Sequence, residues 1–339
     1  MKIRIAIAGF GAWGRMHAKA LTSIDDAEIA AVYCHGESSA AAAQELLPAV
    51  RRFIDYGAML EAGGFDVVNV AVPNNLHAEF AVAAMEAGAN VFLEKPIGLT
   101  LRACDAVIDA SRRTGKLVAV NHELRVSRQW GALRDLVASG ELGRVRYQHL
   151  SLFRHAFRQG SGGWRYEPDR VGSWILEELV HFFDLVMWYA GENGRPASVQ
   201  ALGNDGEGGL ASNLVAILDW ADGSRAVLSQ CLSGFEHHTL LEIAGDAGAA
   251  RTWWSGAMDR TLHPDFALAV RSGAGEPRTI SIPVSGEIFE LEENLRRALQ
   301  GFNEGESVLS PKEARHSVEI CLAAEESLRT GQPVRLAGD

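Results

Sequence analysis

The stretch Met1-Lys-Ile-Arg-Ile-Ala-Ile-Ala-Gly9-Phe-Gly11-Ala-Trp-Gly14 decides the fold of this chain. Its apolar run is typical of a parallel strand that is buried on both faces. The glycines that follow have the spacing G-x-G-x-x-G, and a helical stretch from Arg15 to Ser23 comes next. Gly9 permits a tight turn, Gly11 lets a pyrophosphate approach the backbone, and Gly14 lets the helix pack close to the strand. A strand, this turn and a helix N-terminus together predict a dinucleotide-binding site.

The composition of the 339-residue chain limits the classes of protein to which it can belong. Apolar residues make up 47% and charged residues 22%, which is ordinary for a globular protein long enough for two domains. The net charge of −11 argues against nucleic acid as the main partner, and no apolar run approaches the length of a membrane span. The four cysteines lie far apart without metal-ligand spacing. We therefore expect no metal site, free thiols and a cytoplasmic location.

Residues 1–121 alternate between short apolar runs and helical segments, which predicts a doubly wound parallel sheet, the Rossmann fold. Ligands of such sheets bind beyond the carboxyl ends of the strands. Predicted strands end at Gly9, Cys34, Pro73, Lys95 and Asn121, so we expect these segments to share one site. The residues that we expect to bind the cofactor are Gly9, Phe10, Gly11, Ala12, Trp13, Gly14, Cys34, His35, Val72, Pro73, Asn74, His77, Glu94, Lys95 and Asn121.

The end of the second predicted strand reads Tyr33-Cys-His-Gly-Glu-Ser-Ser39 and bears on the choice between NAD and NADP. NAD-binding sites usually carry an acidic residue here for the ribose, and NADP-binding sites an arginine for the 2′-phosphate. Cys34 takes the place of the acid, and no arginine follows it. Either Glu37 reaches the ribose, or His35 and the two serines hold a phosphate. The sequence leaves both cofactors open.

Residues 122–339 have a different character and form the second predicted domain, an α+β domain with an open, mostly antiparallel sheet. Trp174–Ala190 is a strongly apolar predicted helix, and two amphipathic helices are predicted at Glu287–Phe302 and Pro311–Thr330. The predicted strands are Val145–Arg154, Ser198–Ala201, Ser212–Trp220, Arg225–Leu232, Leu240–Ala244, Ala249–Trp254 and Thr279–Pro283.

Three residues are the candidate catalytic groups: Lys95, His181 and Glu177. Lys95 lies at a strand end between Glu94 and Pro96, where a lysine can stabilise negative charge on a substrate oxygen; the alternative is an ordinary surface lysine. Glu177 and His181 are four residues apart in the apolar helix, so we expect them to share one face. A carboxylate beside a histidine suits general acid–base catalysis; the alternative is a structural pair.

The loop after the first strand of the second domain carries cations and aromatic residues that we expect near the substrate. Glu123 and Arg125, just past the last Rossmann strand, are further candidates. The predicted substrate-binding residues are Lys95, Glu123, Arg125, Arg154, Trp164, Arg165, Glu177 and His181.

These motifs together resemble the Gfo/Idh/MocA family, which is named for glucose–fructose oxidoreductase, inositol dehydrogenase and a rhizopine-catabolism protein. The resemblance covers nearly the whole chain. It rests on the glycine motif, on Pro73-Asn74 followed by His77, on Glu94-Lys95-Pro96, and on the segment from Gly172 to Asp184 that ends in H-x-x-D. Glu177 stands where many members have Asp, which adds a methylene group to the side chain.

The resemblance implies a dehydrogenase that oxidises a secondary alcohol of a sugar, polyol or sugar derivative with NAD or NADP. Lys95 would be the catalytic lysine and His181 the acid–base group, with Glu177 steadying the substrate or the histidine. The resemblance also implies that the second domain, residues 122–339, binds substrate and mediates oligomerisation. Members commonly form homodimers or homotetramers through the open face of the second sheet. Two other functions occur on this fold: redox-neutral, NAD-assisted elimination or glycoside cleavage, and non-catalytic regulation by a dinucleotide-binding protein.

Overall fold

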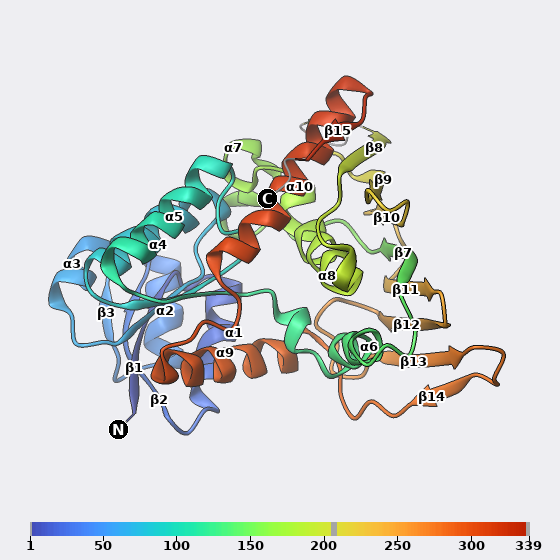
Figure 1. Cartoon of the computed structure of the whole chain (residues 1–339). Helices are drawn as coiled ribbons and strands as arrows, with labels where there is room; N and C mark the ends of the chain where they lie inside the picture. Colours follow the sequence, from blue (N-terminus) through green and yellow to red (C-terminus); the bar gives the residue numbers. More distant parts are fainter. Residues whose placement is uncertain (1, 205–208, 337–339) are drawn as a thin grey trace. The chain divides into compact units, whose positions relative to one another are not determined.

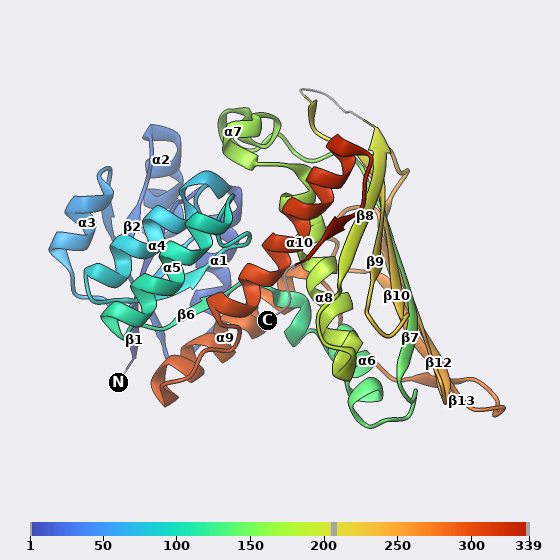
Figure 2. The same cartoon turned by 45° about the horizontal axis from the view of Figure 1, so that its top comes forward.

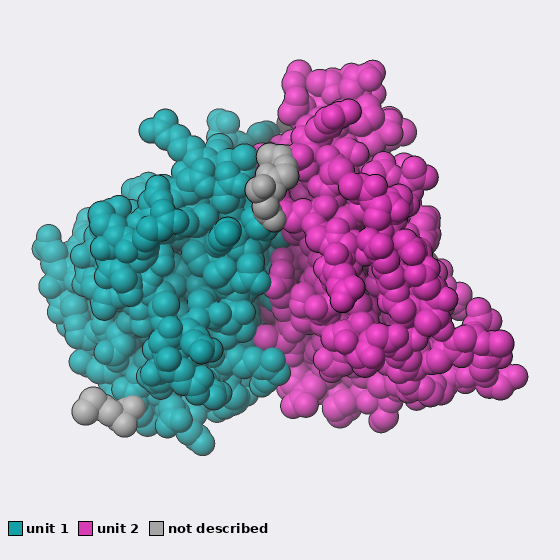
Figure 3. All heavy atoms as spheres, viewed as in Figure 1, with its two compact units in different colours: residues 1–122, 159–172, 291–318 teal, residues 123–158, 173–290, 319–339 magenta. Residues whose placement is uncertain are grey.

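The computed structural model describes residues 2–204 and 209–336, which form two compact units (Figure 3). Unit 1 comprises residues 1–122, 159–172 and 291–318, and unit 2 comprises residues 123–158, 173–290 and 319–339. The chain therefore passes into unit 2 after His122 and returns twice to unit 1. The division into a dinucleotide-binding domain of residues 1–121 and a second domain of residues 122–339 stays a prediction.

Unit 1 contains a parallel sheet of six strands in the order β3-β2-β1-β4-β5-β6. This order confirms the predicted Rossmann fold. The strand β1 is central and almost fully buried, as its apolar sequence requires. The strands are β1 (Ile3–Ala8), β2 (Ala27–Tyr33), β3 (Arg51–Phe53), β4 (Val67–Val70), β5 (Asn90–Leu93) and β6 (Val118–Val120).

Helices connect these strands and cover the sheet. The helices α4 and α5 lie side by side (Figures 1 and 2). The helix α1 shares one apolar core with β1, β2 and residues Leu291–Phe302 of α9 (Glu287–Glu304). Thr100 and Asp55 cap α5 and α3 with their side-chain oxygens, which explains where these helices begin. The helical segments are α1 (Ala12–Thr22), α2 (Glu37–Leu46), α3 (Tyr56–Ala62), η1 (Asn74–Leu76), α4 (His77–Glu86), α5 (Leu101–Thr114), η3 (Ser161–Tyr166) and α7 (Pro168–Val171).

Unit 2 contains a sheet of nine strands in the order β14-β13-β12-β11-β7-β10-β9-β8-β15. Only the β7–β10 pair is parallel among the described strand pairs, so the predicted mostly antiparallel sheet is confirmed. The strands are β7 (Val145–Phe153), β8 (Ser198–Asn204), β9 (Asn213–Asp219), β10 (Arg225–Cys231), β11 (His237–Gly245), β12 (Gly248–Gly256), β13 (Asp265–Ser272), β14 (Arg278–Ile280) and β15 (Val334–Arg335). The strand β13 was not predicted, although Phe266, Leu268 and Val270 alternate along it.

The helices α6 and α8 lie on one face of this sheet (Figure 2). The hydroxyl of Tyr189 in α8 donates to the Trp130 carbonyl of α6, and the Gln148 side chain of β7 donates to the Val186 carbonyl of α8. These bonds join two helices and the sheet in one core. The remaining helical segments are η2 (Glu123–Val126), α6 (Arg128–Ala138), η4 (Ile175–Leu179), α8 (Val180–Ala190), η5 (Gly191–Asn193), α9 (Glu287–Glu304) and α10 (Pro311–Thr330).

Candidate functional site

The glycine turn between β1 and α1 has the geometry of a pyrophosphate cradle. Gly9 has a φ of +99°, and a Cβ atom there would lie 2.5 Å from the Ala71 carbonyl oxygen. A Cβ atom on Gly14 would lie 2.0 Å from the Gly9 carbonyl oxygen, so Gly14 is needed where helix and strand meet. A Cβ atom on Gly11, by contrast, would meet no described atom within 4 Å. The chain's own packing requires Gly9 and Gly14, whereas Gly11 borders open space of the kind that a bound pyrophosphate fills.

The end of β2 carries groups suited to either cofactor. Cys34 is buried with its thiol 3.6 Å from the Ser39 carbonyl oxygen, and burial raises the pKa of this thiol. The exposed ring of His35 lies 3.5 Å from the Tyr33 hydroxyl. Glu37 begins α2 and is exposed. A carboxylate for a ribose and an imidazole for a phosphate are thus both present, and the cofactor remains NAD or NADP.

Glu94, at the end of β5, is the centre of a buried polar network in unit 1. Its Oε1 lies 2.9 Å from His17 Nε2 and accepts a hydrogen bond of 2.7 Å from Asn121 Nδ2. The Trp13 indole donates to the same carboxylate. Burial alone would raise the pKa of Glu94, but the hydrogen bond and charge of His17, with Lys95 and Trp13, hold it below its ordinary value. Glu94 is therefore an ionised carboxylate directly before the candidate catalytic lysine.

The network extends to residues distant in sequence. His17 Nδ1 lies 2.9 Å from the Asn69 side chain on β4, and Asn121 accepts a hydrogen bond of 2.7 Å from Asn294 of α9. His17 and Asn121 are both fully buried. The sequence analysis missed His17, although the helical spacing of Gly14, His17, Ala18 and Leu21 places it on the buried face of α1.

His77 and Asn74 fasten the loop that follows β4. The His77 ring nitrogens lie 2.7 Å from the Pro96 carbonyl oxygen and 2.9 Å from the Val72 carbonyl oxygen. Asn74 donates to the Val171 carbonyl oxygen at 3.1 Å. Carbonyl oxygens only accept hydrogen bonds, so a ring nitrogen of His77 donates to at least one of these two carbonyl groups. His77 thus links the loop to the segment that follows Lys95, and Asn74 links it to α7. The cofactor role of these two residues stays a prediction.

In unit 2, the 3₁₀ turn η2 faces α8 with two charged side chains. Glu123 Oε1 lies 3.7 Å from His181 Nε2, and both side chains are 8% exposed. Arg125 donates two hydrogen bonds to Asp184, of 2.6 Å from Nε and 2.8 Å from Nη2. The carboxylate described beside His181 therefore comes from Glu123, which the sequence analysis had placed on the substrate.

The helix that carries His181 differs from the prediction at its start. One α-helix over Trp174–Ala190 was expected, but Ile175–Leu179 form a π turn before α8 begins at Val180. A π turn has i→i+5 hydrogen bonds, so the helix is wider at this turn than in α8. That Glu177 and His181 share one face of the helix stays a prediction. Both side chains are buried, and π turns often occur at functional sites.

The remaining predicted substrate-binding residues lie in both units. In unit 2, Arg154 Nη1 lies 2.8 Å from Glu178 and Nη2 lies 3.3 Å from Asp259. Burial alone would lower the pKa of this guanidinium, but the two carboxylates outweigh it and raise the pKa. In unit 1, the guanidinium of Arg165 lies 4.8 Å from the Trp164 ring centroid. The charge of Arg154 is thus already compensated within unit 2.

Glu287 belongs to the same charged cluster and was not predicted. A quarter of its side chain is exposed, yet burial of the carboxylate raises its pKa to about 7, while Arg260 at 3.1 Å opposes this shift. Asp259 and Glu178 add to the shift because like charges disfavour ionisation. These residues come from the start of α9, from the π turn η4 and from the segments that follow β7 and β12, and no local sequence pattern brings them together.

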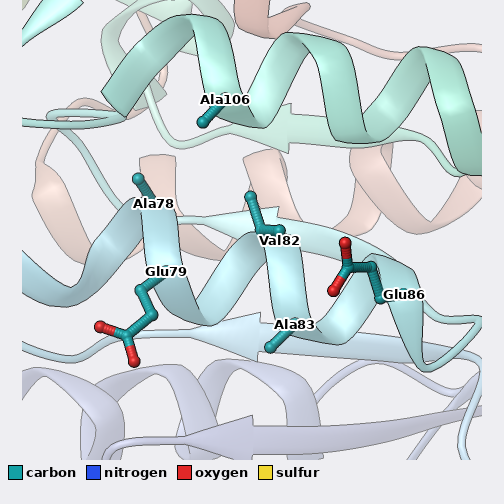
Figure 4. A pocket seen from close by; sticks show the side chains of 6 residues that line it. All are labelled: Ala78, Glu79, Val82, Ala83, Glu86 and Ala106. Carbon is teal, nitrogen blue, oxygen red and sulfur yellow. The ribbon is translucent and has the colours of Figure 1, made fainter. Parts of the chain in front are cut away.

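A groove between α4 and α5 in unit 1 holds none of the predicted residues (Figure 4). It is lined by Ala78, Glu79, Val82, Ala83, Glu86 and Ala106. These methyl groups and two carboxylates offer no group for the expected chemistry. Among the described residues, no cluster of His, Cys, Asp and Glu could hold a metal ion, and no helix is long and apolar enough to cross a membrane.

Comparisons with known proteins agree with this geometry. Residues 3–122 match the model of an oxidoreductase family with an NAD-binding Rossmann fold, and residues 130–251 match the GFO/IDH/MocA C-terminal domain. Inositol 2-dehydrogenase of Corynebacterium glutamicum is 26% identical over 273 residues, 78% of each chain. The 1,5-anhydro-D-fructose reductase of Ensifer adhaerens is 26% identical over 279 residues, 80% of each chain. An oxidoreductase of Agrobacterium radiobacter, solved with NAD⁺, L-tartaric acid and magnesium, superposes with a TM-score of 0.83 at 18% identity, covering 99% of this chain and 98% of that one.

Proposed function

Because the chain belongs to the Gfo/Idh/MocA family of oxidoreductases, we propose that it oxidises a secondary alcohol of a sugar or polyol, with Lys95 and His181 as catalytic groups. Membership confirms the predicted resemblance and the enzyme class, an NAD(P)-dependent oxidoreductase acting on CH–OH groups. The names of two relatives, an inositol dehydrogenase and an anhydrofructose reductase, support the substrate class.

One observation carries the role of Lys95. It directly follows Glu94, a buried ionised carboxylate that His17 and Asn121 hold at the end of β5. Parallel sheets bind their ligands beyond such strand ends. An ammonium group whose backbone is anchored in this way is suited to a fixed position beside a reacting oxygen.

The proposed mechanism divides the work between the two side chains. His181 accepts the proton of the substrate hydroxyl, so that the O–H bond breaks and an N–H bond forms. The ammonium group of Lys95 donates a hydrogen bond to the same oxygen as negative charge develops on it. The nicotinamide, when bound, supplies the acceptor for the hydride. Glu177, buried at the π turn, is proposed to steady the substrate or the histidine.

The experiment is a titration with NADH and NADPH by nicotinamide fluorescence, followed by a polyol and aldose panel scored for NAD(P)H formation. We expect Lys95→Ala to lower turnover by about 10²–10³-fold, the usual loss of an oxyanion donor, with cofactor affinity unchanged. Lys19→Ala, an exposed lysine on α1, is the matched control. Turnover of Lys95→Ala within about tenfold of wild type would contradict the role of Lys95.

The same panel separates the other functions of this fold. Cofactor binding with product but no net NAD(P)H formation would favour redox-neutral elimination. Binding without any product would favour a dinucleotide-binding regulator.

We also propose that the protein is a homodimer or homotetramer that associates through the face of the nine-stranded sheet opposite α6 and α8. Tyr147 and Phe153 of β7 are 45% and 46% exposed there. Leu202 and Val215, cross-strand partners on β8 and β9, are 64% and 42% exposed. Exposed apolar side chains that gather on one sheet face often mark an interface. Sedimentation velocity measures the state directly.

A further inference from the structure

The segment Glu123-Leu-Arg125 in η2 and the segment from His181 to Asp184 in α8 meet at two points. Glu123 lies 3.7 Å from His181, and Arg125 binds Asp184 through two hydrogen bonds. Glu123 and Arg125 are two residues apart in a 3₁₀ turn, and His181 and Asp184 are three apart in an α-helix. The contact between Arg125 and Asp184 therefore also determines where Glu123 lies along α8.

The contact between Arg125 and Asp184 is the rigid one. A guanidinium that donates from Nε and Nη2 to both oxygens of one carboxylate has a fixed orientation. The Asp184 side chain is 1% exposed, and the Arg125 guanidinium also lies 5.7 Å from the Trp188 ring centroid. Buried carboxylates require such pairing, because transfer of an isolated charge from water is costly. The charge of Asp184 is thereby compensated, and η2 is fastened to α8.

The two hydrogen bonds between Arg125 and Asp184 hold Glu123 beside His181. Its side chain and that of His181 are each 8% exposed, so water screens their interaction poorly. Other charged groups near this helix include Glu177 and Glu178 of the π turn, of which Glu178 is already paired with Arg154. Towards the end of α8, Arg134 lies 5.8 Å from the Trp188 ring centroid, and Arg134 and Glu290 act on Tyr189. A buried carboxylate 3.7 Å from an imidazole favours the protonated ring.

We propose that Glu123 is the positioning residue for His181: it orients the imidazole and stabilises the imidazolium that forms when the ring accepts the substrate proton. This inference rests on the proposed function of His181 as the acid–base group. The proton moves from the hydroxyl oxygen to the ring, and the carboxylate stays ionised. Arg125 and Asp184 act one step further away, by keeping η2 in place.

The test compares Glu123→Gln, which keeps the shape and removes the charge, with the wild-type enzyme. The midpoint of the His181 titration is followed by NMR of the histidine ring carbons, and His181→Asn assigns the signal. We expect Glu123→Gln to lower this midpoint by about one pH unit or more, since an opposite charge at this distance contributes about 1–3 units. The matched control is Glu242→Gln, which removes a carboxylate paired with Arg251 elsewhere in unit 2. Glu123→Asp is expected to restore part of the shift.

The pH profile of kcat/KM gives the second readout, because His181 must be unprotonated to accept the proton. Removal of the carboxylate moves the acidic limb of alcohol oxidation to lower pH, and cofactor affinity stays unchanged. An unmoved NMR midpoint and an unmoved limb in a folded Glu123→Gln protein would overturn the role of Glu123 and leave the proposed function intact. If instead His181→Asn keeps both rate and limb, the acid–base role of His181 fails, and the role of Glu123 fails with it.

Discussion

Replacement of Glu94 by glutamine tests whether the buried network is held together by charge. The substitution keeps the shape of the side chain, and an amide oxygen can still face His17 Nε2 and Asn121 Nδ2. Hydrogen bonds to a charged partner contribute about 1.5–3 kcal/mol, and neutral ones about 0.5–1.5 kcal/mol. The two bonds together lose about 2 kcal/mol, which corresponds to about a 30-fold change in an equilibrium constant at about 1.4 kcal/mol per tenfold.

Native-state hydrogen exchange is the appropriate assay, because a protein with two compact units need not unfold in a single step. The reporting amides are that of Glu94, which donates to the Val70 carbonyl, and that of Asn121, which donates to the Leu93 carbonyl. We expect protection of these amides to fall by about 30-fold at pH 7. Glu86→Gln is the control, since its partner Arg113 is exposed and such pairs contribute only about 0–1 kcal/mol.

The pH dependence follows from the lowered pKa of Glu94. A depressed folded-state pKa contributes stability that is present above the unfolded value of 4.5 and is lost as the pH falls through the folded value. The difference between wild type and Glu94→Gln should therefore shrink as the pH drops below about 4.5. Two results would refute the assignment of Glu94 as an ionised carboxylate. One is that Glu94→Gln loses no more protection than Glu86→Gln, and the other is that the difference between wild type and Glu94→Gln does not shrink below pH of about 4.5.

Two further predictions concern the glycine turn and the charged cluster of unit 2. Gly14→Ala should destabilise the protein by about 1–3 kcal/mol, because its Cβ would lie 2.0 Å from the Gly9 carbonyl oxygen. Gly11→Ala should leave the melting temperature unchanged but weaken NADH binding by about tenfold or more. If Gly11→Ala and Gly14→Ala change melting temperature and NADH affinity alike, the glycine turn is not a pyrophosphate cradle. Glu287 has a folded pKa of about 7, above its ordinary 4.5, so it lowers stability as the pH rises between these values. The melting temperature of Glu287→Gln relative to that of the wild type should therefore rise from pH 5 to pH 8. If the melting temperatures of the two proteins change in parallel over this range, Glu287 is already ionised at pH 5.

The sequence predicted the parts of the fold that local chemistry determines. Gly9 and Gly14 are each required by contacts within a few residues or across one strand pair, and the apolar run of β1 requires burial on both faces. Such requirements are visible in the sequence. The strand β13, which was not predicted, is also determined locally, because apolar residues alternate along its sequence.

Two features of the candidate site could not be predicted in this way. The π turn at Ile175–Leu179 inserts one residue into a helix whose sequence has no glycine or proline to mark it. The contact between Glu123 and His181 joins residues 58 positions apart, and its partner contact between Arg125 and Asp184 joins residues 59 apart. Both depend on how η2 packs on α8. A motif search therefore finds Glu177, which is near His181 in sequence, but has no signal for Glu123, which lies 3.7 Å from His181 in space.

The two proposed catalytic groups have one physical feature in common: each adjoins a buried carboxylate whose position other side chains determine. Glu94 precedes Lys95 and is held by His17 and Asn121, whereas Glu123 faces His181 and is held through Arg125. Burial makes these carboxylates costly unless their partners are in place, so the same contacts that stabilise the fold also fix the charges around the reacting groups. A substitution at either carboxylate will then change stability and rate together. Only measurements that separate the two, such as a ring titration or local hydrogen exchange, can distinguish a positioning residue from a structural one.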